Sequence, residues 1–190
     1  PHGGDSMAGL TLYGCDEGKP HCREFVQIQL IEPLVAGQEY SVHFWVSPLP
    51  RGLRINRIGA FFSVEEIREQ TDAQLSYTPQ VAAEKIVEAE DGQWVSISGR
   101  FVAGQPANYL IIGNFFPDSL TQTSAPPEDA LPFAYYYLDD VVLKKEEPIL
   151  PVPVPDDDLS KVEIEQGKTI PLRNIFFETD EAELLPRSYV

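Results

Sequence analysis

The sequence has few basic residues. Lysine and arginine number 14 against 30 aspartates and glutamates, which leaves a formal net charge of −16 over 190 residues. A protein that binds nucleic acid needs a basic surface to neutralise phosphates, and attraction to an anionic membrane surface needs one as well. We therefore expect neither nucleic acid nor an anionic membrane surface as a partner.

Long hydrophobic runs are also lacking. No stretch reaches the roughly 18 consecutive apolar residues of a membrane-spanning helix. Hydrophobic residues still make up 43% of the chain and aromatic residues 11%, which is typical of a folded protein rather than a disordered acidic tail. The length fits one domain of about 150 residues with an appendage.

Groups that could carry out catalysis are sparse. The three histidines are dispersed, at His2, His21 and His43, and the sequence has no G-x-S-x-G motif and no glycine-rich phosphate loop. Asp139 and Asp140 are adjacent on a predicted strand, so we expect their side chains to face opposite sides and not to act together as acid and base. We expect a protein that is not an enzyme.

The chain has two cysteines, Cys15 and Cys22, in a turn-rich segment. Two cysteines so close together, between two predicted strands, indicate a disulfide formed in an oxidising compartment. Two alternatives remain: a zinc site built from these cysteines with His21 and His2, and two free thiols in a reducing compartment.

Charge and proline divide the chain near residue 145. Residues 1–144 carry 19 acids and 9 bases, whereas the much shorter segment 145–190 carries 11 acids and 5 bases. Residues 145–160 contain four prolines within eight residues, followed by three aspartates. Prolines lack a backbone donor and favour polyproline II, so we expect a semi-rigid extended linker at 145–160. A proline-rich ligand for an adaptor domain is the alternative.

Before the linker, apolar and polar residues alternate over short runs. In Glu39–Val46 the pattern directs Tyr40, Val42, Phe44 and Val46 to one face, which leaves His43 and Trp45 on the other. We expect further strands at Ala8–Tyr13, Phe25–Leu30, Ile58–Ser63, Trp94–Phe101, Tyr109–Phe116 and Tyr135–Leu143. Short, aromatic-rich strands of this kind predict an all-β sandwich.

One helix is expected, at Val64–Gln70, where three glutamates near the start suit the positive end of a helix dipole.

A set of motifs in residues 1–144 resembles a known family. The motifs are His2–Leu10, Arg23–Gln27, Glu32–Gly37, Tyr40–Ser47, Ile58–Ser63, Ile112–Phe115 and Tyr135–Val141. As an ordered set they resemble the galactose-binding-like, carbohydrate-binding-module-like jelly roll that precedes an OmpA-type module in envelope proteins of Gram-negative bacteria. The resemblance implies a jelly-roll β-sandwich at 1–144.

The segment after the linker is similar to the opening strand and first helix of the OmpA C-terminal α/β domain. The similarity covers Gly167–Val190 within residues 161–190. That family clamps peptidoglycan with an Asp and an Arg, and both lie beyond Val190 in the family pattern. The family's jelly roll also begins with strands that would precede Pro1. We therefore expect a chain shortened at both ends, with an unpaired sheet edge where the first strand would lie.

The resemblance implies a periplasmic tether associated with the outer membrane. Its jelly roll would dock on an outer-membrane β-barrel protein related to type IX secretion or gliding, while the OmpA-like module would hold peptidoglycan. The alternative is a carbohydrate-binding module that recognises a glycan through exposed aromatics. Trp45, His43 and Tyr136 are the candidates, Tyr136 because it faces away from Tyr135 and Tyr137. Against this, the second sheet face could be covered by a loop or by the opposing sheet.

Related jelly rolls also hold a structural calcium ion. Asp5 and Asp140 match two of its ligand positions in type, and oxygen ligands in an acidic loop suit calcium. The alternative role for Asp140 is to accept hydrogen bonds from backbone amides at a turn.

Overall fold

The computed structural model describes residues 1–14, 22–71, 73–90, 92–126, 129–147 and 167. The chain divides into two units, Pro1–Pro148 and Ile149–Val190. The first unit holds every strand described below. Lys145, at the expected start of the linker, is instead the last residue of the strand Ala134–Lys145 (β10). The rest of the linker from residue 149 and the OmpA-like segment fall in the second unit, of which only Gly167 is described.

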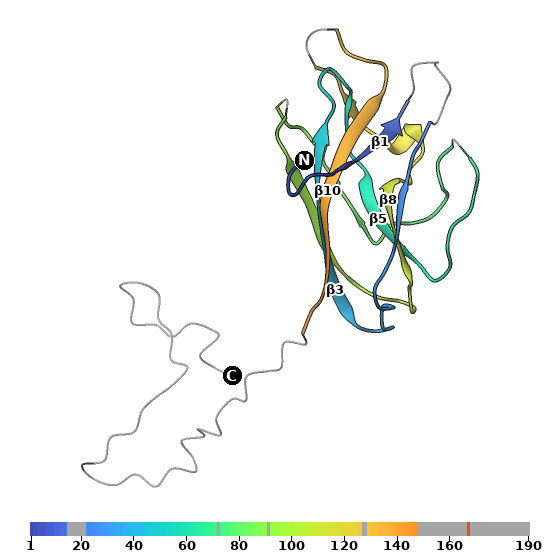
Figure 1. Cartoon of the computed structure of the whole chain (residues 1–190), viewed down its shortest axis with the longest axis vertical. Coiled ribbons are helices and arrows are strands. Elements are labelled where there is room, and N and C mark those ends of the chain that lie inside the picture. Colours follow the sequence, from blue (N-terminus) through green and yellow to red (C-terminus); the bar gives the residue numbers. More distant parts are fainter. Residues whose placement is uncertain (15–21, 72, 91, 127–128, 148–166, 168–190) are drawn as a thin grey trace. The chain divides into compact units, whose positions relative to one another are not determined.

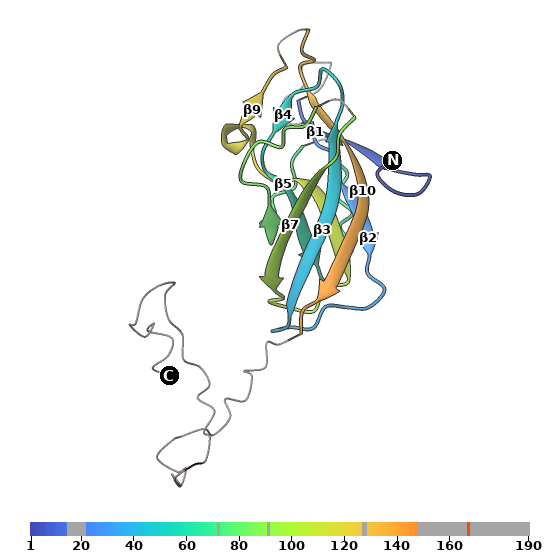
Figure 2. The same ribbon diagram turned by 90° about the vertical axis from the view of Figure 1, so that its left-hand side faces the viewer.

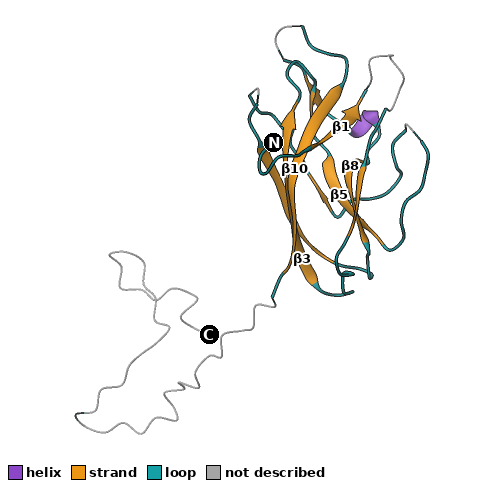
Figure 3. Cartoon of the chain, viewed as in Figure 1, coloured by secondary structure: helices purple, strands orange, loops and turns teal. Residues whose placement is uncertain are grey.

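The first unit is an antiparallel β-sandwich of the jelly-roll type, as the sequence predicts (Figures 1 and 3). One sheet has the order β1 (Ala8–Tyr13), β10 (Ala134–Lys145), β3 (Glu39–Pro48) and β7 (Val95–Val102). The other has the order β2 (Val26–Gln29), β8 (Tyr109–Asn114), β5 (Ile58–Ser63) and β6 (Val81–Ala82). A small third sheet pairs β4 (Arg54–Ile55) with β9 (Thr123–Ser124), after the 3₁₀ turn η1 (Asp118–Leu120).

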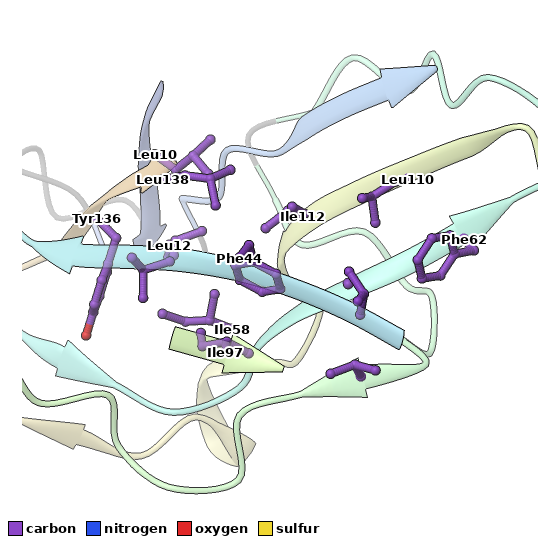
Figure 4. Packing of buried hydrophobic residues seen from close by; sticks show 14 of the residues in the cluster. Leu10, Leu12, Phe44, Ile58, Phe62, Ile97, Leu110, Ile112, Tyr136 and Leu138 are labelled. Atoms are coloured by element: carbon purple, nitrogen blue, oxygen red, sulfur yellow. The ribbon is translucent and has the colours of Figure 1, made fainter. Parts of the chain in front are cut away.

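The core lies between the two large sheets (Figure 4). The expected inward set of β3 is confirmed, because Tyr40, Val42, Phe44 and Val46 are all buried. Opposite them lie buried residues of the second sheet: Ile58, Ala60, Phe62, Leu110 and Ile112. Large buried side chains at alternate positions account for much of the stability of such a sandwich.

Three short strands escape the sequence pattern, and the expected helix is absent. Strands β4, β6 and β9 have two residues each, which is too few for alternation to be visible.

The segment Val64–Gln70, where a helix is expected, is not helical. The amide of Gln27 on β2 holds this segment instead, donating to the carbonyl of Ile67 and accepting from its N–H. A helix of only seven residues is marginal by itself, so these tertiary hydrogen bonds prevail.

Strand β10 contains a bulge that corrects a second expectation. Its register with β3 shifts between Asp139 and Val142, and Asp140 has a positive φ of 47°. A residue in this left-handed conformation breaks the alternation of side chains. The two carboxylates therefore do not face opposite sides: both contact the segment that begins at His2.

The second half of β10 has a strand partner on one side only. Strand β1 pairs with β10 no further than Leu138, whereas β3 pairs with it as far as Lys145. Within the described ranges, no strand lies beside Val141–Lys145 on the β1 side. Among all the described residues of the chain, no helix is long and apolar enough to cross a membrane.

Candidate ligand-binding site

The outer face of β10, β3 and β7 carries a shallow groove with a volume of about 460 Å³, on the face that Figure 2 presents. The groove is lined by Ser41, Val42, His43, Trp45, Ser98, Gly99, Arg100, Asp140, Val142 and Lys144. The alternation of side chains along β3 brings the outward residues of this strand into the groove. The residues that flank these positions on β3 point into the core, so Ser41, His43 and Trp45 point outward.

The register of the three strands arranges these side chains in rows across the sheet. Ser41 lies opposite Lys144 on one side and Arg100 on the other. His43 lies between Val142 and Ser98 in the same way.

Trp45 forms the next row, opposite Asp139 of β10 and Ser96 of β7. The groove thus runs along β3 from a row with two cationic side chains to a row with an indole. Serine and glycine form much of its floor, and these small residues make the face concave.

The Trp45 end is closed by the N-terminal segment. The ring of His2 stacks on the indole of Trp45, with centroids 4.1 Å apart and an angle of 18°. His43 lies 5.4 Å from the same indole on the groove side, and the ring of Trp94 meets His2 edge-on at 5.7 Å. These contacts fix the orientation of Trp45 while its side chain still borders the groove.

The bulge carboxylates hold this segment in place. Asp139 Oδ2 accepts hydrogen bonds from the backbone N–H groups of His2 (2.8 Å) and Gly3 (3.2 Å), and Oδ1 accepts one from that of Asp140 (2.8 Å). Burial raises the pKa of Asp139, but these donors outweigh it and hold the pKa below its ordinary value. Asp139 therefore stays ionised at neutral pH and keeps His2 over Trp45.

Asp140 contacts the ring of the same histidine. Its Oδ2 lies 2.6 Å from Nδ1 of His2, so the carboxyl group and the ring share a hydrogen bond. Gly3 lies directly above Asp140, since a Cβ on it would come within 2.8 Å of Oδ2. A side chain at position 3 would require the Asp140 side chain to move from this position.

The structure sorts the expected ligand-binding residues. Trp45 and His43 face outward, as predicted, and the structure shows that both border the groove. The expectation for Tyr136 is wrong: its side chain is 0% exposed and lies in the core. On β10 the residues at 134, 136 and 138 point inward, so Tyr135 and Tyr137 are the pair on the outer side.

Asp5 and Asp140, the residues expected to bind calcium, are both exposed. At the bulge, Asp139 accepts backbone N–H groups and Asp140 contacts the ring of His2, so both carboxyl groups already have partners in the N-terminal segment. Within the described ranges, no three His, Cys, Asp or Glu side chains are grouped to hold a metal. Asp139, rather than Asp140, accepts the backbone amides.

Cys22 is disulfide-bonded. Its only possible partner within the chain, Cys15, lies outside the described residues, as does His21 of the alternative zinc site. Near Cys22, the buried guanidinium of Arg23 pairs with Asp118 and lies over the ring of Tyr13.

Sequence reasoning missed most of the groove. Ser41, Ser98 and Arg100 alternate outward on predicted strands, so their outward direction follows from the pattern. Lys144 lies one residue beyond the expected strand Tyr135–Leu143, and its outward direction follows from the bulge. Which strands are neighbours, and in which register, does not follow from the pattern. Only the order β10, β3, β7 brings the two basic residues to either side of Ser41.

Comparison with known proteins adds little to this description of the groove. Neither a protein-family model nor a curated protein matches the chain. Among solved structures, it is similar to the crystallographic structure of the N-terminal CBM22-1–GH10 modules of Clostridium thermocellum endo-1,4-beta-D-xylanase 10B complexed with xylohexaose. The TM-score is 0.41 and the identity 14%, over 76% of this chain and 25% of that chain. The chain spans a quarter of that solved chain, and a likeness at this level carries no inference about ligand or activity.

Proposed function

We propose that the sandwich is a non-catalytic module that binds a carbohydrate chain in the groove over β10, β3 and β7. The observation that carries the proposal is the position of Trp45 at one end of a concave sheet face that combines apolar surface with hydroxyl and charged groups. Sugar rings present both apolar C–H faces and hydroxyl groups. An indole beside serine hydroxyls and charged side chains offers a partner for each.

The shape of the groove supports this proposal over a compact ligand pocket. Its volume of about 460 Å³ is open along the sheet rather than enclosed, which suits one stretch of a longer chain. The absence of catalysis is part of the proposal. Among the residues that line the groove, Asp140 is the one carboxylate, and it already contacts His2. General acid–base hydrolysis of a glycosidic bond uses two carboxyl groups that flank it.

Affinity electrophoresis through gels containing soluble polysaccharides tests the proposal. Trp45→Ala should lose the retardation that the wild type shows with its best ligand. Trp94→Ala is the matched control, because Trp94 also contacts His2 but does not line the groove. If both variants are retarded as strongly as the wild type, the carbohydrate does not bind in the groove.

A second candidate is the envelope tether implied by the sequence resemblance. In this proposal the sandwich docks on an outer-membrane protein in the periplasm, and an OmpA-like module, of which residues 161–190 would be the start, anchors to peptidoglycan. The open half of β10 supports the docking part. Glu146 N–H donates to the carbonyl of Glu39 on β3, so by alternation Leu143 and Lys145 direct their backbone groups to the unpaired side.

An apolar groove of about 570 Å³ lies beside this edge, between β10 and the segment Ile28–Val35. Ile31 is 102% exposed at its rim, and Val142 is 42% exposed on the strand itself. Unpaired backbone groups beside an apolar groove suit an added β-strand from a partner protein.

Lys145→Pro tests the docking by removing one outward backbone donor without touching the ladder to β3. Lys145→Ala keeps the donor and serves as the control. An outer-membrane protein captured from solubilised membranes by the wild type and by Lys145→Ala should be lost with Lys145→Pro. Equal capture by all three would argue against docking at this edge.

A further inference from the structure

The groove is charged unevenly along its length. At one end the side chains of Lys144 and Arg100 flank Ser41 on neighbouring strands, and all three line the groove. At the other end Asp140 lies beside Trp45. Strands are about 4.8 Å apart, so the two basic residues start about 10 Å from each other, and their long side chains can converge over the small serine.

The two basic side chains are available to a ligand. The Arg100 side chain is 61% exposed, and its ion pair with Glu146 is loose at 3.6 Å. Lys144 is exposed and forms no ion pair with a described residue. Neither side chain is needed to hold the sheet together.

The chain's overall acidity does not cancel this local arrangement. Exposed charges separated by more than about 8 Å are largely screened at physiological ionic strength, so nearby groups dominate within the groove. A guanidinium and an ammonium that face one point bind a carboxylate well, since a guanidinium matches its two oxygens.

We propose that the carbohydrate is acidic, with the carboxylate of a uronic acid unit held between Lys144 and Arg100 over Ser41 and a sugar ring further along the chain against Trp45. This inference rests on the proposed carbohydrate-binding function and adds the ligand class and its direction along the groove. Ser41 and Trp45 are four positions apart on β3, or about 13 Å, so the two contacts involve different sugar units.

The probe is an oligogalacturonate together with its fully methyl-esterified form, which has the same sugars without the charge. Isothermal titration should show the wild type binding the acid at least about ten-fold more tightly, since charge-assisted hydrogen bonds are worth more than neutral ones. In Arg100→Gln/Lys144→Gln the two affinities should become equal. In Arg51→Gln/Arg68→Gln, which removes two exposed charges that do not line the groove, the preference should persist.

Three results would overturn the inference. The wild type could bind both forms equally, the groove variant could keep its preference for the acid, or the two double variants could lose that preference to the same extent. In each case binding of the methyl ester would leave the carbohydrate-binding function standing. Absence of binding to both forms and to a panel of neutral polysaccharides would overturn the proposed function as well.

Discussion

The hydroxyl of Tyr136 shows why this residue belongs to the core. It accepts a hydrogen bond from the N–H of Ile55 and donates one to the carbonyl of Val87, both at 3.0 Å. It therefore joins β10 to the short strand β4 at Ile55 and to the loop at Val87. A polar group of this kind is tolerated inside the sandwich because both of its hydrogen-bonding roles are filled.

Tyr136→Phe should lower the free energy of unfolding by about 1–3 kcal/mol, because two buried backbone groups lose their partner. Urea denaturation at neutral pH measures the change. Tyr137→Phe is the control, since Tyr137 is half-buried on the outer side of β10 and should change stability by less than about 0.5 kcal/mol. Equal effects of the two substitutions would show that the hydroxyl of Tyr136 is not engaged.

The buried hydroxyl of Tyr136 should also make the free energy of unfolding fall at alkaline pH. Burial raises its pKa from 10.0 to about 12, although the N–H of Ile55 and the charge of Arg54 oppose the shift. The folded state favours the neutral phenol, so this contribution is complete below pH 10 and is lost as the pH rises towards 12. Between these values the wild type should lose about 2–3 kcal/mol more than Tyr136→Phe. Parallel stability curves would contradict this.

At the scale of elements, the bulge in β10 determines how the site is built. It turns Asp139 and Asp140 towards the same segment, and that segment places His2 on Trp45. A regular strand would direct one of the two carboxylates into the sandwich. The bulge thus connects a local backbone feature to the closed end of the groove.

Asp140→Val should destabilise the protein by about 1–2 kcal/mol relative to Asp140→Gly, because a β-branched side chain is strained at a positive φ. Comparing the two variants cancels the loss of the contact with His2. Lys144→Val, at an exposed position on the same strand, should be close to neutral. Thermal unfolding measures all three, and equal stability of the Val and Gly variants would contradict the bulge geometry.

Much of the sandwich was predictable from the sequence because alternation is a local signal. It gives the bounds of Ala8–Tyr13 and Ile58–Ser63 to the residue and the outward direction of Trp45. The burial of Tyr136 was not predictable in the same way, since three consecutive tyrosines do not show which face is inward. The bulge and the strand order depend on contacts between residues far apart in the chain, and these determine the groove.

For the molecule as a whole, the net charge of −16 describes the surface only on average. The described sandwich places two basic side chains and an indole on one sheet face and leaves an apolar edge on another side. These two surfaces correspond to the two proposed functions. They share β10, whose outer face borders the first groove and whose open edge borders the second.

Chemical-shift mapping by NMR tests the central claim most directly. On titration with the tightest-binding oligosaccharide, the largest changes should fall on Ser41, His43, Ser98, Arg100 and the indole N–H of Trp45. The amides of Ile31, Leu34 and Leu143 beside the open edge should remain still, as an internal control. Changes concentrated at that edge, or spread evenly over the surface, would contradict carbohydrate binding in the groove over β10, β3 and β7.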